Sequence, residues 1–268
     1  MLAPLEHGDV TQLQFSTWKS RASNMQVSAF VCDGVLIDAG FPDVVPELSA
    51  WVDAHPIDGA IVTHAHEDHS AAVAALTQRG IGVHCAPQSE ALMRADERVG
   101  YYRQFCWGPR RTLTLPLKPF ASTRFELRHA PGHSADHHVV WDHETGTVFC
   151  GDLFIGVKLR LAHHDEDVRQ QIGVLREVAS WNPTRMFDAH RGLLDKPVAL
   201  LNAKADWIEA TVAEVEKLAR EGLDEASIRT RVLGPEELTG VISFGAYSRL
   251  NFVRNTLTQP HSPARATT

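Results

Sequence analysis

The order of apolar and polar positions predicts strands and helices in alternation along the chain. Runs of about four to eight apolar or alternating residues predict strands, and apolar residues three or four positions apart predict helices. Strands are expected at 13–18, 27–31, 35–38, 57–63, 80–85, 125–129, 139–141, 147–150 and 186–187. Helices are expected at 44–54, 88–98, 165–180, 195–221, 224–233 and 248–254. Alternation of this kind favours an α/β layered fold.

One hairpin has an unusually clear signal. Asp33 and Gly34 separate the apolar runs 27–31 and 35–38. An Asp-Gly pair between two apolar runs is the strongest short-range indication of a β-hairpin. These two strands are therefore expected to be sequential neighbours in a sheet.

Composition narrows the class of protein. The chain has 268 residues, 44% of them hydrophobic, and a net charge of −7. This charge argues against a nucleic-acid partner or an anionic membrane surface. No apolar run approaches the ~18 residues of a membrane span, and no basic segment followed by an apolar run opens the chain as in a signal peptide. The four cysteines form no Cys-x-x-Cys pair and fit reduced thiols, so we expect a cytoplasmic protein.

The candidate chemistry is concentrated between residues 63 and 69. His64 and His66 are two positions apart behind an apolar run, so on an extended chain they project to the same side. Asp68 and His69 follow where a small-residue helix is expected. So many ligands in so few residues suit two adjacent metals better than one tetrahedral ion. The alternative is a solvated loop in a chain with 15 histidines, but the position at a strand end favours the metal site.

Five motifs occur in an order that resembles the metallo-β-lactamase-fold hydrolases. They are Asp38-Ala39-Gly40, His64-x-His66-x-Asp68-His69, Pro131-Gly132-His133-Ser134, Cys150-Gly151-Asp152 and Ala189-His190-Arg191-Gly192. Arg191 departs from the glycine that more often follows the last histidine. The motifs extend over residues 25 to 192. The resemblance implies a four-layer αβ/βα sandwich with the site at one edge of two facing sheets.

The resemblance also implies the ligand set. One metal would be bound by His64, His66 and His133, the other by Asp68, His69 and His190, with Asp152 bridging the two. Histidine and carboxylate ligands without a thiolate suit Zn²⁺, Mn²⁺ or Fe²⁺. We expect two Zn²⁺ ions.

The expected function is hydrolysis of a small ester, thioester, lactone or lactam by a hydroxide that bridges the two metals. Asp68 would bind metal and also orient the hydroxide or carry a proton. A phosphodiesterase or nuclease is a second interpretation, disfavoured by the acidic charge. An iron-dependent sulfur dioxygenase is a third, which the ligand types leave open. A di-iron redox protein is disfavoured because such members carry Glu at the position of His66. A non-enzymatic binding module is least favoured, because inactive relatives usually lose ligands that are intact here.

Two features could bind the substrate, which we expect to be a small molecule. Lys158 follows Asp152 by a few residues, where several branches of the family have a cation that holds a substrate carboxylate; the alternative is a solvated lysine. The aromatic segment 101–107 could line a substrate pocket or pack on the core.

The motifs also suggest a division of the chain. We expect a metal-binding domain at 1–194, a C-terminal helical extension at 195–259 and a disordered tail at 260–268. The helix expected at 195–221 has an apolar stripe that predicts either core packing or a homodimer contact.

Overall fold

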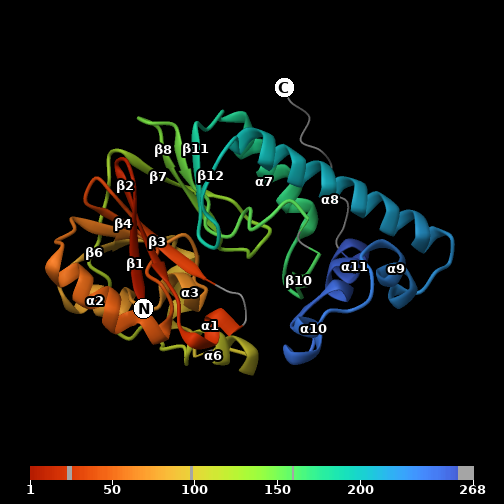
Figure 1. Cartoon of the computed structure of the whole chain (residues 1–268), viewed down its shortest axis with the longest axis horizontal. Helices are drawn as coiled ribbons and strands as arrows, with labels where there is room; N and C mark the ends of the chain where they lie inside the picture. The colour runs from red at the N-terminus through yellow and green to blue at the C-terminus, as the bar shows by residue number, and fades with distance from the viewer. Residues whose placement is uncertain (23–25, 97–98, 159, 259–268) are drawn as a thin grey trace. The chain divides into compact units, whose positions relative to one another are not determined.

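The computed structural model describes residues 1–22, 26–96, 99–158 and 160–258, which form two compact units (Figure 1). The first unit contains Met1–Ala130, Asp136–Ile155 and Pro183–Pro197. The second contains Pro131–Ala135, Gly156–Asn182 and Val198–Thr268. Residues 131–135 and 156–182 are thus grouped with the C-terminal helices although they precede residue 195. The tail expected at 260–268 lies outside the described residues.

A six-stranded sheet begins the first unit. Its strands lie in the order β1 (Leu2–His7), β2 (Val10–Phe15), β3 (Val27–Cys32), β4 (Val35–Ile37), β5 (Gly59–Ile61) and β6 (Gly82–His84). The pairs from β1 to β4 are antiparallel, and β4–β5 and β5–β6 are parallel. Parallel neighbours need crossover connections, which contain α2 (Val45–Ala54) in one case and α3 (Glu67–Ser70) and α4 (Val73–Gln78) in the other.

The predicted hairpin joins β3 and β4. Cys32 pairs with Val35, and the two residues between them have positive φ, 50° at Asp33 and 72° at Gly34. Two successive left-handed residues match the twist of a two-residue hairpin, and Asp-Gly adopts this conformation at low cost. The hairpin prediction is confirmed.

A five-stranded sheet completes the strand content of the first unit. Its strands lie in the order β12 (Gly192–Leu194), β11 (Arg185–Asp188), β9 (Thr147–Phe149), β8 (His138–Asp142) and β7 (Phe125–His129). The β9–β11 pair is parallel and the other pairs are antiparallel. The ends of β9 and β11 lead directly to Asp152 and His190.

The two sheets share a buried aromatic core. Phe30 from the first sheet lies 5.6 Å from Phe149 and 5.3 Å from Phe187 of the second, measured between ring centroids. All three side chains are 2% exposed or less. The first sheet also contributes to a second apolar cluster that includes Leu48 of α2 and Leu76 of α4. The first unit therefore contains helices packed on a sheet that faces a second sheet, as the sandwich interpretation requires.

Its other helices are η1 (Pro42–Val44), α1 (Trp18–Ala22), α5 (Pro87–Arg94) and α6 (Tyr101–Trp107).

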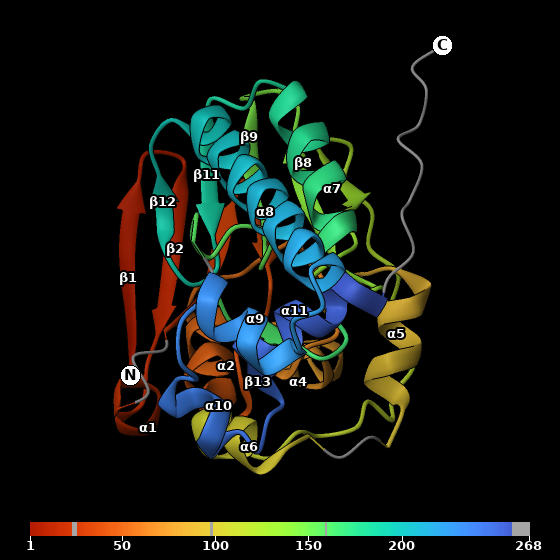
Figure 2. The ribbon, with the colours of Figure 1, turned by 90° about the vertical axis from the view of Figure 1, so that its right-hand side faces the viewer.

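The second unit is mostly helical (Figure 2). Its elements are α7 (Val168–Ser180), α8 (Pro197–Arg220), α9 (Glu225–Val232), α10 (Leu238–Ile242), α11 (Arg249–Thr258) and the short strand pair β10 (Ala162–His163) and β13 (Tyr247–Ser248). Arg176 of α7 forms ion pairs with Asp206 and Glu209 of α8, at 2.5 and 2.9 Å. Along α8, Leu201, Ala205 and Val215 of the predicted apolar stripe are fully buried. The stripe is therefore buried in the single chain, as its core-packing interpretation predicts.

Two expectations about the chain as a whole can be compared with the structure. The four cysteines all lie within the described ranges and are free thiols. Within the described ranges, no helix has both the length and the hydropathy of a membrane span.

Several element boundaries differ from the expectation. The strand expected at 13–18 is β2, which ends at Phe15, and Trp18 begins α1 instead. The helix expected at 88–98 is α5, which ends at Arg94, and its last two expected positions lie outside the described residues. Strand β1 was not expected, because it is half exposed and contains Pro4, so its apolar pattern is weak. Proline is tolerated there because β1 lies at the edge of its sheet.

Candidate metal centre

The ligand-rich segment forms the predicted strand, turn and helix. Strand β5 ends at Ile61, and α3 begins at Glu67 directly after His66. His64 and His69 are fully buried and Asp68 is 5% exposed. Polar side chains are this deeply buried only when other groups satisfy them. The hydrogen-bond partners of each candidate ligand therefore indicate which of its atoms is available to bind a metal.

Asp38 is the support for this segment. Its Oδ1 accepts hydrogen bonds from the backbone N–H and hydroxyl of Thr63, at 2.8 and 2.9 Å. Its Oδ2 accepts a hydrogen bond from His69 Nδ1 at 2.8 Å. A metal-binding histidine typically donates its second ring N–H to a carboxylate in this way, which fixes the tautomer. Nε2 of His69 is thus the atom presented to a metal.

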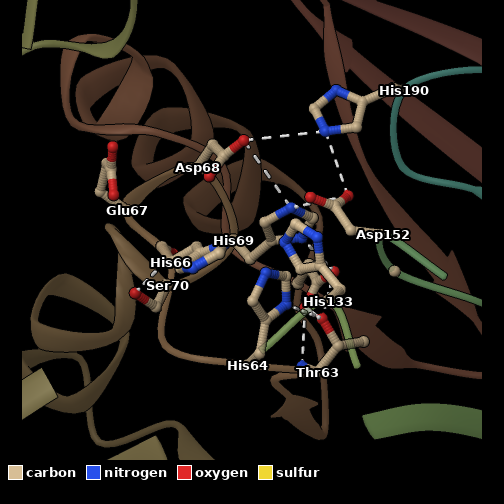
Figure 3. A network of polar contacts seen from close by, with 12 residues as sticks. Thr63, His64, His66, Glu67, Asp68, His69, Ser70, His133, Asp152 and His190 are labelled. Carbon is tan, nitrogen blue, oxygen red and sulfur yellow. Dashed lines mark hydrogen bonds and ion pairs between the residues drawn. The ribbon is translucent and has the colours of Figure 1, made fainter. Parts of the chain in front are cut away.

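Four side chains of the first unit converge around one point, as Figure 3 shows. Asp68 Oδ2 lies 3.8 Å from His69 Nε2 and 3.8 Å from His190 Nε2. Asp152 Oδ1 lies 3.2 Å from His69 Nε2 and 3.1 Å from His190 Nε2. Ligand bonds of about 2.0–2.2 Å in a tetrahedral zinc site place neighbouring ligand atoms about 3.3–3.6 Å apart. The donor set and its spacing therefore fit a divalent cation.

A second group of candidate ligands also includes Asp152. His64, His66 and Asp152 each offer a ligand atom within 4.8 Å of the others. The rings of His64 and His66 lie 4.5 Å apart between centroids, inclined at 67°. The structure thus brings together, within the first unit, the candidates at 64, 66, 68, 69, 152 and 190.

His133 lies on the five-residue segment 131–135, which belongs to the second unit. Its neighbours in that unit include Glu166, whose Oε1 lies 3.7 Å from His133 Nδ1. The imidazole is 9% exposed. Its assignment to the metal of His64 and His66 stays a prediction of the sequence motifs.

The charges within the group oppose the effect of burial. Burial alone would lower the pKa of His190, but the adjacent Asp152 and Asp68 carboxylates raise it to about 9. His69 is also buried, and Asp152, Asp38 and Asp68 raise its pKa well above the ordinary value. The carboxylates therefore favour positive charge at this site. A divalent cation can replace the protons, so metal binding releases protons.

Asp188 was missed by the sequence motifs. Its Oδ1 accepts hydrogen bonds from the backbone N–H groups of His190 and Arg191, both at 2.9 Å. Its Oδ2 accepts one from the backbone N–H of Ile155 at 2.7 Å. Ile155 has a φ of 52°, which is rare and strained for a β-branched residue. One fully buried carboxylate therefore joins the loop of Asp152 to the loop of His190.

His137 supports the backbone of Asp152. Its Nε2 accepts a hydrogen bond from the backbone N–H of Asp152 at 3.1 Å, and its Nδ1 lies 3.0 Å from the carbonyl of Ala130. A Cβ at Gly151 would lie 2.8 Å from His137 Nε2, and Gly151 has a φ of 49°. Only glycine therefore allows this approach. His137 belongs to none of the sequence motifs, and it is fully buried behind the candidate ligands.

The remaining candidates lie elsewhere. Lys158 is exposed on a turn of the second unit, and its substrate-binding role stays a prediction. In the aromatic segment, which forms α6, Tyr101 and Phe105 are 82% and 48% exposed whereas Trp107 is 2% exposed. His163, His164 and Asp165 of the second unit form another group that could hold an ion, with the last two exposed.

The sequence of this chain matches the model of one protein family and resembles several known proteins. The sequence profile described as the metallo-beta-lactamase superfamily matches residues 25–206, more than half of the chain. Hydroxyacylglutathione hydrolase of Pseudomonas aeruginosa is 26% identical over 227 residues, 81% of this chain and 77% of that protein. Beta-lactamase-like protein 2 homolog of Caenorhabditis elegans is 24% identical over 193 residues, 70% of this chain. The match spans 62% of the nematode protein, less than two thirds of its length.

Solved structures that resemble this chain include metallo-beta-lactamases. The metallo-beta-lactamase from Pontibacter korlensis has a TM-score of 0.60 and 18% identity, covering 78% of this chain and 99% of that chain. The DIM-1 metallo-beta-lactamase has a TM-score of 0.59 and 16% identity, covering 78% and 97%. At these identities the likeness establishes the shared fold, and it confirms the fold class expected from the motifs.

Proposed function

Because the chain belongs to the metallo-beta-lactamase superfamily, we propose that it is a metal-dependent hydrolase with a dinuclear site. The observation that carries the proposal is the convergence of Asp68, His69 and His190 on Asp152, with ligand atoms 3.1–3.8 Å apart. Asp152 is shared with the group of His64 and His66. A carboxylate shared by two ligand groups is suited to bridge two cations.

The residues have separate roles in this proposal. His64, His66 and His133 would hold one cation, Asp68, His69 and His190 the other, and Asp152 would bridge them. Two bound divalent cations, of which zinc is the first choice, would supply Lewis acidity that activates water at neutral pH and neutralises a leaving oxyanion. Asp38 and Asp188 keep the ligands in position, and Asp68 would orient the attacking water and accept its proton.

A thioester is the substrate class to test first. Relatives that cover most of the chain are named hydroxyacylglutathione hydrolase, which is the name of a thioester hydrolase. A small ester, a lactone and a lactam are the other members of the proposed class. The net charge of −7 supports a small-molecule substrate over nucleic acid or an anionic membrane.

The test combines metal analysis with a substrate panel. Protein purified without added metal should contain close to two equivalents of zinc. It should hydrolyse a thioester, ester, lactone or lactam, and activity should disappear with a chelator and return with Zn²⁺. A reproducible single equivalent of iron with sulfur-oxidising activity, or cleavage of phosphodiesters alone, would contradict the proposal.

A further inference from the structure

Arg103 of α6 forms a close ion pair with the residue that precedes Asp68. Its Nε and Nη2 lie 2.5 Å from Oε1 and Oε2 of Glu67. The Glu67 side chain is 3% exposed and that of Arg103 is 14% exposed. Burial is the main cause that raises the pKa of Glu67, and Arg103 opposes it. Two-point pairing between guanidinium and carboxylate planes fixes geometry as well as charge.

The same guanidinium reaches Asp68. Arg103 Nη2 lies 3.9 Å from Asp68 Oδ1. The other oxygen, Oδ2, faces the ring nitrogens of His69 and His190 (Figure 3). The two oxygens of Asp68 therefore face different partners. Oδ1 faces the guanidinium of Arg103, and Oδ2 faces His69 and His190, which with Asp68 would hold the cation called here the second metal.

Helix α6 approaches this ligand group at a second point. Trp107 is four residues after Arg103, on the same face of the helix. Its ring lies 6.4 Å from the His190 ring, inclined at 29°. Tyr101 and Phe105 lie on the opposite, exposed face. One face of α6 is thus directed at both Asp68 and His190, which in the proposed function would hold the second metal and not the first.

We propose that Arg103 is a positioning residue that orients Asp68 toward the second metal, so that α6 sets the affinity for that ion. The inference rests on the proposed dinuclear site. Because Glu67 neutralises Arg103, the pair adds little net charge to the site, and its contribution is orientation. For the same reason Arg103 is not a binding group for an anionic substrate. Partners that orient a metal ligand typically change metal affinity by about 10–100-fold.

The experiment is a Zn²⁺ titration of the metal-free full-length protein in competition with a chromophoric chelator. The wild type should bind two equivalents in two resolvable steps. Arg103→Met should weaken one step by about 10–100-fold and leave the other nearly unchanged. Arg103→Met also leaves the buried Glu67 carboxylate uncompensated, so its Tm should fall.

The double variant Glu67→Gln/Arg103→Met separates positioning from mere neutralisation. It removes both charges, so the Tm of the metal-free protein should recover. The weakened metal-binding step should not recover, because the contact with Asp68 is still missing. Recovery of both properties would overturn the inference, because Arg103 would then serve only to neutralise Glu67.

The matched control is Arg79→Met. Arg79 also pairs through two nitrogens with a carboxylate, that of Asp53, at 2.8 and 3.0 Å, but this pair is exposed. Both metal-binding steps should be unchanged. Failure of the wild type to bind a second equivalent would instead contradict the proposed function and remove the basis of the inference. If the wild type binds Zn²⁺ in two steps and Arg103→Met binds it identically, the inference about Arg103 is contradicted while the proposed function stands.

Discussion

The Asp38 carboxylate and the His69 imidazole form a hydrogen bond of 2.8 Å in which both side chains are almost fully buried. Asp38 has a φ of 62°, a conformation that asparagine also tolerates. Asp38→Asn therefore preserves the backbone but replaces one acceptor oxygen with an amide that only donates. His69 must then present an acceptor at Nδ1 and a proton at Nε2, the wrong tautomer for a metal ligand.

We expect Asp38→Asn to weaken metal binding by about 10–100-fold with little loss of secondary structure. The measurement is metal content after dialysis against a weak chelator, with circular dichroism as the check on folding. Asp53→Asn, at an exposed ion pair, is the control. Equal metal retention by Asp38→Asn and the wild type would show that Asp38 does not select the tautomer.

Asp68→Asn tests the chemical role of this residue. The amide nearly preserves volume and can still coordinate through oxygen, but it loses the negative charge and the proton acceptor. We expect the fold to be retained, most metal to be bound when Zn²⁺ is supplied in excess, and kcat to fall by about 10²–10⁴-fold. Activity is measured on the substrate found in the panel, at measured metal content. Full activity with both metals bound would place proton transfer on another group.

Lys158→Ala tests the predicted substrate anchor. An exposed lysine that holds a substrate carboxylate acts alike in the ground and transition states, so KM should rise while kcat is retained. The comparison uses one substrate with a carboxylate and an analogue without it. Identical kinetics of variant and wild type on the carboxylate substrate would make Lys158 an ordinary solvated side chain.

His137 predicts a loss of stability in acid. Burial lowers its pKa from 6.5 to about 4, so between these values the unfolded chain binds a proton that the folded protein does not. Stability is therefore complete above pH 6.5 and declines as the pH falls toward 4, by about 3 kcal/mol in total. His137→Gln retains an acceptor for the Asp152 N–H and does not titrate.

The measurement for His137 is the Tm of the metal-free protein across this pH range. The variant should show a flatter profile than the wild type, whatever its absolute Tm. Because every other titrating group is common to both proteins, the difference between the two profiles isolates His137. Parallel profiles would contradict the prediction.

The candidate ligands His64, His66, Asp68 and His69 can be named from the sequence because they lie within six residues and need only local spacing to come together. The residues that hold them are not predictable in this way. Arg103 meets Glu67 across 36 residues, and Asp188 meets Ile155 across 33. Such pairs follow from the packing of α6 and of two loops, and no periodicity in the chain records them.

The strands show the same limit. Those with a fully buried pattern, such as β4 and β9, lie within the predicted ranges. The edge strands β1 and β12 were missed: β1 is half exposed and contains Pro4, and β12 comprises only two leucines after a glycine, Gly192–Leu194. Apolar patterning detects runs of apolar or alternating residues, so it finds the edge strands β6 and β7 as well as the central ones and passes over β1 and β12, whose apolar runs are short.

The link that Asp188 makes between two loops has a consequence for biosynthesis. On a growing chain His64 and His66 emerge early, but Asp152 cannot be fixed against His190 until β11 has been made and has paired with β9. The group of Asp68, His69, Asp152 and His190 is therefore complete only when most of the chain has been synthesised. In the proposed dinuclear enzyme, the cation of this group would then be bound after the two sheets have formed, and not during their synthesis.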